Sequence, residues 1–351
     1  MALSKILPAS QDQFAGARNL IINGAMQVAQ RGTSASVSNN SNENYQTLDR
    51  WYFTYGNNAG GTVTVSQDST VPSGEGFANS YKVDVTSADT SLAADDNILI
   101  GQTIESQNIA NSGWNYTSSN SFVTASFYAR SSVDTTLCLV ARSYDAGYYY
   151  VKEFSLTANT WKRVTCSIPG NSNLVFDDNT GQGLGIWIIL ASGTSYNDSS
   201  DGAWNASFKV ATSNQSNFLA SPGNILHLTG VQLEVGEATP FEHRSFGDEL
   251  AKCQRYFELL GHAVSSGGDG YSFMSVSLNG NAANQWLDVG FKVEKRAAPS
   301  SIDSFNSYTV PSPTATGIGV NGFTLYKGSQ MIFIKSGGSN GDAVASVSAE
   351  L

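Results

Sequence analysis

The sequence predicts an all-β protein: an antiparallel jelly-roll sandwich, one connecting α-helix and a second, small β domain. Three observations lead to this fold class. The 351 residues include 34 Gly, 8 Pro and only 14 % charged residues, which is typical of short strands joined by tight turns. Segments that alternate apolar and polar residues recur along most of the chain. Only one segment has the apolar spacing of an amphipathic helix.

Residues 1–17 form a short polar arm that is too small to be a domain. It is either an arm that docks on other proteins or a plain tail. The arm contains one Lys and no apolar stretch of signal-peptide length. No run of about 18 apolar residues occurs in the chain, so we expect neither an export signal nor a membrane span.

Residues 18–245 are expected to form the jelly-roll sandwich. Roughly ten short strand-like segments are separated by turn-forming residues, with no amphipathic helix between them. The segment 81–87 alternates strictly, whereas 183–192 is almost entirely apolar, as in a central strand. This series favours two antiparallel sheets packed face to face. The expected strands cover 49–55, 61–67, 81–87, 121–132, 135–143, 147–156, 160–168, 183–192, 206–212 and 225–236.

Residues 246–262 are expected to be a linking helix. Apolar residues in FGDELAKCQRYFELL, residues 246–260, recur at alternating spacings of four and three, which is an a/d heptad pattern. Two heptads are too short for a stable coiled coil on their own. The apolar stripe therefore packs either on the sandwich or on symmetry-related copies of itself. The candidate oligomer-interface residues are Phe246, Leu250, Cys253, Phe257 and Leu260.

Residues 263–351 return to strand patterns and are expected to form the C-terminal β domain. Its clearest segments are 285–293 and 322–328, which are rich in aromatic and β-branched residues. Residues 262–270, HAVSSGGDG, are expected to form a flexible connection between the helix and these strands.

The net charge of −10 argues against general nucleic-acid binding, which needs a basic surface. It also argues against docking on a membrane through a polybasic patch. Cys138, Cys166 and Cys253 form no CxxC pair and are expected to be buried thiols, in a protein made in a reducing cytosol. We expect no cofactor.

We expect no enzymatic activity. The three His form no HExxH motif, and there is no GxSxG motif and no P-loop. The acidic pairs Asp95-Asp96 and Asp177-Asp178 are the only support for a glycoside-cleaving site. Asp177 and Asp178 are also weak calcium candidates, because calcium prefers several oxygen ligands. A plain Asx-rich turn is the alternative at that position.

Aromatic residues gather beside turns in the second half of the sandwich. Exposed Tyr and Trp rings can stack on the apolar faces of sugars. In a strand, Tyr149 must face away from Tyr148 and Tyr150, so some of these rings can reach solvent. The alternative is that all of them pack in the core or in an interface. The candidate glycan-stacking residues are Tyr144, Tyr148, Tyr149, Tyr150, Trp187, Tyr196 and Trp204.

Several motifs resemble a family of bacteriophage tail-fibre and related virion proteins. They are RNLIINGAMQVAQRG at 18–32, DRWYF at 49–53 and the stretch 231–260, with GFKVEKRAAPS at 290–300 and SAEL at 348–351. The stretch 231–260 contains a Pro-Phe-Glu corner and ends in Cys-Gln-Arg-Tyr before the last apolar residues. The chain departs from the family pattern at Lys295, where a Met is usual.

The resemblance implies a jelly-roll sandwich similar to carbohydrate-binding modules, a small C-terminal β domain and assembly as a homotrimer on a virion. It implies no catalytic residues. We therefore expect a tail-fibre adhesin that attaches the phage to a host surface polysaccharide and contacts other tail proteins through residues 1–17. The alternatives are a polysaccharide depolymerase, or a purely structural tail adaptor or head-decorating fibre.

Overall fold

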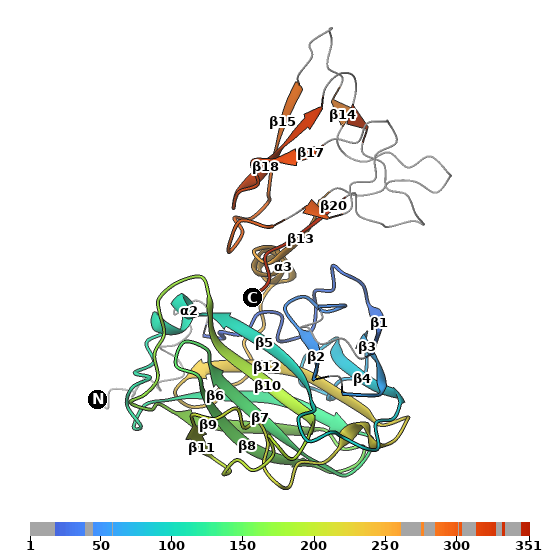
Figure 1. The fold of residues 1–351 in the computed structure, drawn as a ribbon, viewed down its shortest axis with the longest axis vertical. Coiled ribbons are helices and arrows are strands. Elements are labelled where there is room, and N and C mark those ends of the chain that lie inside the picture. The colour runs from blue at the N-terminus through green and yellow to red at the C-terminus, as the bar shows by residue number, and fades with distance from the viewer. Residues whose placement is uncertain are drawn as a thin grey trace, which may run out of the picture. The chain divides into compact units, whose positions relative to one another are not determined.

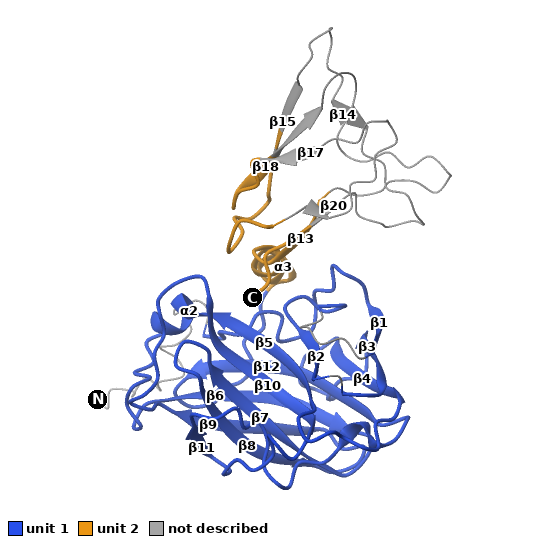
Figure 2. Ribbon diagram, in the orientation of Figure 1, with its two compact units in different colours: residues 1–244 blue, residues 245–351 orange. Residues whose placement is uncertain are grey.

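The chain divides into two compact units, residues 1–244 and residues 245–351 (Figure 2). The expected arm, residues 1–17, lies outside the residues that the structure describes. No helix in the described part of the chain is long and apolar enough to cross a membrane. The structure, a computed structural model, describes residues 18–38, 45–57, 59–260, 275–276, 285–300, 302–303, 314–327, 332–333 and 345–351.

Unit 1 is built from two six-stranded antiparallel sheets (Figure 1). Sheet A has the strand order β1-β3-β4-β12-β6-β9, with bounds Ser34–Ser38, Thr62–Asp68, Ser80–Ser87, Ile225–Val235, Phe122–Ser131 and Lys162–Pro169. Sheet B has the strand order β11-β8-β7-β10-β5-β2, with bounds Ala203–Asn205, Tyr148–Leu156, Thr135–Ser143, Gln182–Ser192, Asn97–Glu105 and Tyr52–Gly56. This architecture confirms the predicted antiparallel jelly-roll sandwich. Two short helical segments, α2 (Ser106–Ala110) and η2 (Phe218–Ala220), lie between strands.

The main core lies between the two sheets and follows from the alternation of the strands. In β4, Tyr81, Val83 and Val85 are buried in this core, because successive side chains of a strand point to opposite faces. Cys166 also lies there, and burial raises the pKa of its thiol to about 12. All three cysteines are free and buried, as predicted.

Four segments of the sandwich differ from the expected strands: residues 206–212 form no strand, and β1, β5 and β11 were not expected. Residues 206–212 were expected to be a strand but form none, and the backbone N–H groups of Val210 and Ala211 donate instead to the Tyr196 carbonyl. Val210 and Ala211 both join the apolar cluster on the outer face of sheet B, which the alternation of a strand would not have allowed for two successive residues. Conversely, β5 was not expected. It is buried along its whole length, and Gln102 and Thr103 interrupt its apolar residues.

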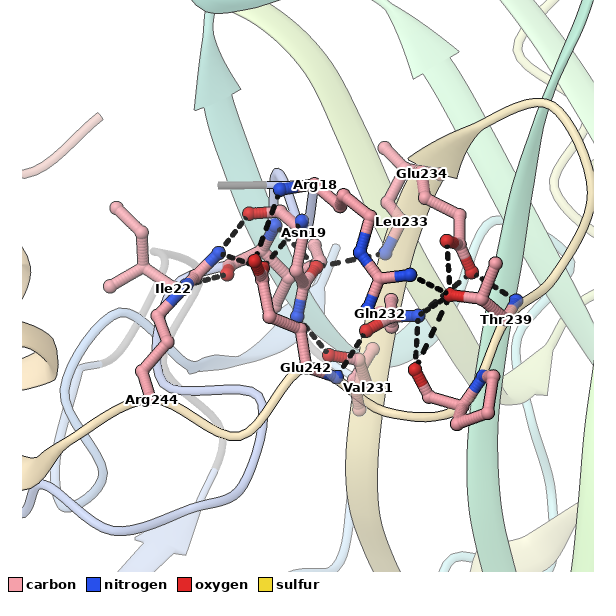
Figure 3. Close-up of polar contacts among 12 residues, drawn as sticks. Arg18, Asn19, Ile22, Val231, Gln232, Leu233, Glu234, Thr239, Glu242 and Arg244 are labelled. Carbon is pink, nitrogen blue, oxygen red and sulfur yellow. Dashed lines mark hydrogen bonds and ion pairs between the residues drawn. The ribbon is translucent and has the colours of Figure 1, made fainter. Parts of the chain in front are cut away.

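Polar contacts hold the N-terminal end of unit 1 against its C-terminal end (Figure 3). Asn19 Nδ2 donates to the Val231 carbonyl at 3.1 Å, and Asn19 Oδ1 accepts from the Leu233 N–H at 3.0 Å. Glu242 Oε2 accepts from the Asn19 N–H at 2.9 Å and lies 3.0 Å from Arg244 Nη2. Buried polar groups need such partners, so these contacts fix both ends of the sandwich.

Unit 2 begins with helix α3 (Phe246–Gln254), which starts after its N-cap residue Ser245. The prediction of a helix through residue 262 was wrong. The chain leaves the helix and forms β13 (Phe257–Leu260), which pairs with β20 (Ala345–Ser348). The strand partner lies far away in the sequence, so the local heptad pattern could not indicate it.

The apolar stripe expected on one helix therefore does not form a single helical face. Cys253, Phe257 and Leu260 are buried, but Phe257 and Leu260 belong to β13. Leu250 is half-buried, and Phe246 is 57 % exposed. Only the beginning of the predicted stripe remains accessible on the helix.

A buried ion pair joins the start of unit 2 to a later segment. Lys295 Nζ lies 2.6 Å from Glu258 Oε2 and donates to the Gln254 carbonyl at 2.5 Å, and both charged side chains are fully buried. Lys295 is the position where the resembling family usually has Met.

The further strands of unit 2 are β14 (Ser275–Val276), β15 (Gln285–Gly290), β16 (Ile302–Asp303), β17 (Thr314–Thr316), β18 (Gly322–Lys327) and β19 (Ile332–Phe333).

Replacing Glu242 by Gln is expected to destabilise the sandwich by about 1–3 kcal/mol at pH 7, because a hydrogen-bonded carboxylate is lost. Burial raises the pKa of Glu242, but the Asn19 N–H and the charge of Arg244 outweigh it and lower the pKa below the usual 4.5. A carboxyl with a lowered folded-state pKa contributes stability above its unfolded pKa, and this is lost as the pH falls through the folded pKa.

Urea unfolding at pH 7 and at about pH 3.5 should therefore show the largest difference between wild type and E242Q at pH 7. The matched control is Glu237→Gln, an exposed Glu in the same corner, which should leave the stability unchanged. An equal loss in both variants would contradict the role of Glu242.

Candidate functional site

The outer face of sheet B carries a second apolar cluster, separate from the main core. Strands β2, β5, β7, β8 and β10 all contribute to it, and the segment 206–212 covers part of it. Half-buried aromatic residues border it, among them Tyr45, Tyr144, Tyr196 and Phe208. Its buried members are Tyr52, Leu99, Cys138, Val140, Tyr149, Val151, Trp187, Ile189, Val210 and Ala211.

A glycine lets two of these aromatic rings meet across three strands. Gly101 in β5 lies opposite Tyr52 in β2 on one side and opposite Trp187 in β10 on the other. A Cβ atom on Gly101 would lie only 2.7 Å from atoms of both rings. Trp187 Nε1 donates to the Tyr52 hydroxyl at 2.7 Å, so the glycine makes room for a bonded aromatic pair.

Arg142 lies among three aromatic rings beside this pair. Its guanidinium carbon is 4.0 Å from the ring centre of Tyr144, 5.3 Å from that of Trp187 and 5.5 Å from that of Tyr149. Cation–π attraction favours each of these positions. We call Arg142, Tyr144, Tyr149 and Trp187 the Arg142 cluster. Trp187 and Tyr149 are buried, whereas Arg142 and Tyr144 are half-exposed.

Hydroxyl groups accompany the rings of the cluster. Thr103 Oγ1 lies 3.3 Å from the Tyr52 hydroxyl and 3.3 Å from the Tyr144 hydroxyl. Thr103 lies in the same row of sheet B as Gly185 and Arg142. The face thus combines a half-exposed ring, a cation and hydroxyl groups, the combination that a polar ligand with an apolar side requires.

Four of the seven predicted stacking residues lie on this face. Tyr144, Tyr149 and Trp187 belong to the Arg142 cluster. Tyr196 joins them through Phe208, whose ring centre is 4.8 Å from that of Tyr196 and 5.3 Å from that of Tyr149. Because Trp187 and Tyr149 are buried, only Tyr144 and Tyr196 among the four are half-exposed.

The other three predicted residues lie on the opposite side of sheet B. Tyr150 is buried in the main core, and Tyr148 and Trp204 pack against it. Trp204 Nε1 donates to the Pro169 carbonyl at 2.7 Å. Alternation within β8 separates Tyr148 and Tyr150 from Tyr149, as the period of a strand requires, and Trp204 of β11 pairs with Tyr150. Tyr150 is buried, whereas Tyr148 and Trp204 are half-buried against the core.

The aromatic pattern alone did not identify Arg142, Tyr52, Thr103 and Gly101. Arg142 could have been found, because Val140, Arg142 and Tyr144 alternate in one run, so the first two share a face of β7 and Tyr144 follows the strand directly. Gly101 and Tyr52 depend on the pairing of β2, β5 and β10, which the sequence does not show.

The two acidic pairs do not form one site. Asp95-Asp96 precedes the first residue of β5, whereas Asp177-Asp178 lies near the helix α2 that follows β5, since the Gln107 N–H of α2 donates to the Asn179 carbonyl. Nine residues of strand separate the two positions, which corresponds to about 30 Å at roughly 3.3 Å per residue. The two carboxylates of glycosidases lie about 5–10 Å apart.

Asp177 and Asp178, the weak calcium candidates, make hydrogen bonds that are typical of a turn. Asp178 Oδ1 accepts from Asn111 Nδ2 at 2.6 Å, and the Asp177 N–H donates to Asp145 Oδ2 at 3.1 Å. Asp178 has a φ of 50°, a left-handed value that Asp tolerates in turns. Among the described residues, no group of three or more His, Cys, Asp or Glu could hold a metal ion.

No model of a known protein family matches the chain, and no curated protein matches it. Among solved structures, it is similar to the enzymatically active domain of tailspike protein 4 of bacteriophage CBA120, with 12 % identity, a TM-score of 0.33, and coverage of 62 % of this chain and 22 % of that chain. It is similar to an arabinose-bound α-L-arabinofuranosidase, with 12 % identity, a TM-score of 0.35 and coverage of 68 % and 29 %.

A third similar structure is the carbohydrate-binding module TmCBM61 in complex with β-1,4-galactotriose, with 10 % identity, a TM-score of 0.32, and coverage of 63 % of this chain and 100 % of that chain. The chain spans less than a third of the length of the first two structures, at 22 % and 29 %. At TM-scores this low, the likenesses add nothing to the geometry described above.

Replacing Gly101 by Ala is expected to destabilise unit 1 by about 1–3 kcal/mol, because the new methyl group forces the Tyr52 and Trp187 rings apart. Near-UV circular dichroism should show a changed tryptophan signal, and urea unfolding should give the loss of stability. The control is Gly247→Ala in α3, where an added Cβ meets nothing within 4 Å. Unchanged stability and spectrum in G101A would contradict the close packing at Gly101.

Proposed function

We propose that unit 1 is a glycan-binding domain and that the Arg142 cluster is part of its binding face. The observation that carries the proposal is the position of Tyr144, a half-exposed ring with Arg142 against it and Thr103 beside its hydroxyl. A sugar offers apolar C–H faces for the ring and hydroxyl groups for polar partners. The half-buried rings of Tyr45, Tyr196 and Phe208 border the same face and extend this surface.

Trp187 and Tyr149 are positioning residues in this proposal. They are buried, so they do not meet the ligand, but they hold the guanidinium of Arg142 in place from below. A binding face held by packed side chains loses little conformational entropy when the ligand arrives. Sheet B thus positions Arg142, Tyr149 and Trp187, and Tyr144 lies in the turn that follows β7 directly.

We further propose that the protein is a phage adhesin that attaches the virion to a host surface polysaccharide. The support is the resemblance of residues 18–32 and 231–260 to virion proteins, together with the all-β sandwich.

Assembly as a homotrimer would multiply weak binding to a repetitive glycan, and Phe246 of α3 offers an exposed apolar side chain for it. A monomer in mass photometry at micromolar concentration would contradict the trimer.

We propose binding without catalysis. The separation of the two acidic pairs supports this over a depolymerase, because the pairs lie too far apart to act on one glycosidic bond. Reducing ends released from a bound polysaccharide would establish the depolymerase instead. A protein that binds no glycan and leaves phage adsorption unchanged would be a structural tail adaptor or head-decorating fibre.

Tyr144→Leu is expected to weaken glycan binding about 5- to 100-fold, if the lost ring contact contributes roughly 1–3 kcal/mol, the range known for bases stacked on aromatic side chains. A glycan array identifies a ligand for the wild type, and isothermal titration then compares the variants. The matched control is Tyr128→Leu, a half-exposed Tyr that points away from the core in sheet A. Unchanged affinity of folded Y144L, or an equal loss in Y128L, would exclude the Arg142 cluster as the binding face.

A further inference from the structure

We infer that the glycan bound at the Arg142 cluster carries a negatively charged group, which Arg142 contacts. The inference rests on the proposed function and names the class of its ligand: an acidic glycan rather than a neutral one. It is based on the positive charge of Arg142, which has no ion-pair partner among the described residues although the protein as a whole is acidic.

Arg142 differs from the other cations of unit 1. Among the described residues of that unit, every other Lys and Arg side chain donates a hydrogen bond or forms an ion pair within the chain. Arg142 has neither with any described residue, and its Nε is buried without a hydrogen-bond partner. The partnered cations are Arg18, Arg31, Arg50, Lys82, Arg130, Lys152, Lys162, Arg163, Lys209 and Arg244.

A shortage of acidic residues does not explain the missing partner. The chain contains 29 Asp and Glu against 19 Lys and Arg. Acidic residues that follow β7 or lie in the neighbouring strand β8 already accept hydrogen bonds: Asp145 accepts from Ser106 Oγ at 2.7 Å, and Glu153 accepts from Asn214 Nδ2 at 3.0 Å. Arg142 is left with aromatic rings, which hold a cation but do not satisfy its N–H donors.

The geometry favours an anion over a neutral hydroxyl. A guanidinium binds a carboxylate or a sulfate ester through two parallel N–H donors, and hydrogen bonds between charged partners are about twice as strong as neutral ones. Here the rings of Tyr144, Tyr149 and Trp187 hold the guanidinium of Arg142 in place before a ligand binds. An anion would satisfy the donors that the chain leaves unpaired, while Tyr144 contacts the sugar ring that carries it.

Pairs of polymers with the same sugar backbone, one charged and one neutral, show whether binding depends on the charge or on the sugar. Polygalacturonate and its methyl ester differ in the carboxylate, and dextran sulfate and dextran differ in the sulfate ester. A glycan array with neutral, carboxylated and sulfated glycans extends the panel. We expect the wild type to bind at least one charged form about 10- to 100-fold more tightly than its neutral counterpart, with an affinity that falls between 50 mM and 300 mM NaCl as about one ion pair predicts.

Arg142→Met should remove this preference, and Arg142→Lys should keep part of it, because Lys retains the charge but not the paired donors. Arg130→Met, which removes a cation from sheet A, should bind like the wild type. Circular dichroism and thermal unfolding establish that each variant is folded, and R142K gives the answer if R142M does not fold.

Three outcomes overturn the idea in different ways. Equal binding of charged and neutral forms by the wild type, or an unchanged preference in R142M, refutes the charged ligand and leaves glycan binding in place. An equal loss of charge preference in R130M shows general electrostatic attraction instead of a site. No binding by the wild type to any glycan, neutral or charged, refutes the proposed function itself.

Discussion

Burial of sheet B on both of its faces is the constraint on which the rest of unit 1 depends. Its inner face packs against sheet A, and its outer face carries a second apolar cluster covered in part by residues 206–212. A sheet buried on both faces needs apolar residues at successive positions rather than at alternate ones. This explains why β10 is almost entirely buried. It also explains why Cys138 and Trp187 are shielded from solvent although they point away from the main core.

The same constraint explains the chemistry proposed for the outer face. A cation placed beside a buried apolar cluster must find partners there, and Arg142 finds aromatic rings instead of a carboxylate. Gly101 permits the Tyr52–Trp187 contact that supports these rings. The half-exposed residues Arg142 and Tyr144 are thus held from beneath by residues that are too deeply buried to meet a ligand themselves.

Polar contacts hold distant segments of the chain together, both at the two ends of the sandwich and at the start of unit 2. Asn19 and Glu242 hold the first and last described segments of unit 1 together. In unit 2, Lys295 and Glu258 form a buried ion pair next to the end of α3. Breaking a buried ion pair leaves an uncompensated charge and is strongly destabilising, so the Lys295–Glu258 pair specifies which distant segments of unit 2 belong together.

Local pattern in the sequence determined the all-β class, most strands of the sandwich and the start of the helix at Phe246. Strict alternation is sufficient for a strand such as β4, because a period of two is a property of the local chain. Only the tertiary structure decided that the helix ends at Gln254, that β5 lies between β10 and β2 in sheet B and that residues 206–212 cover a sheet without joining it. It also decided that Arg142 meets Trp187, since that contact depends on the pairing of β7 with β10. Pairing of strands is non-local, and a single sequence shows each strand but not its neighbour.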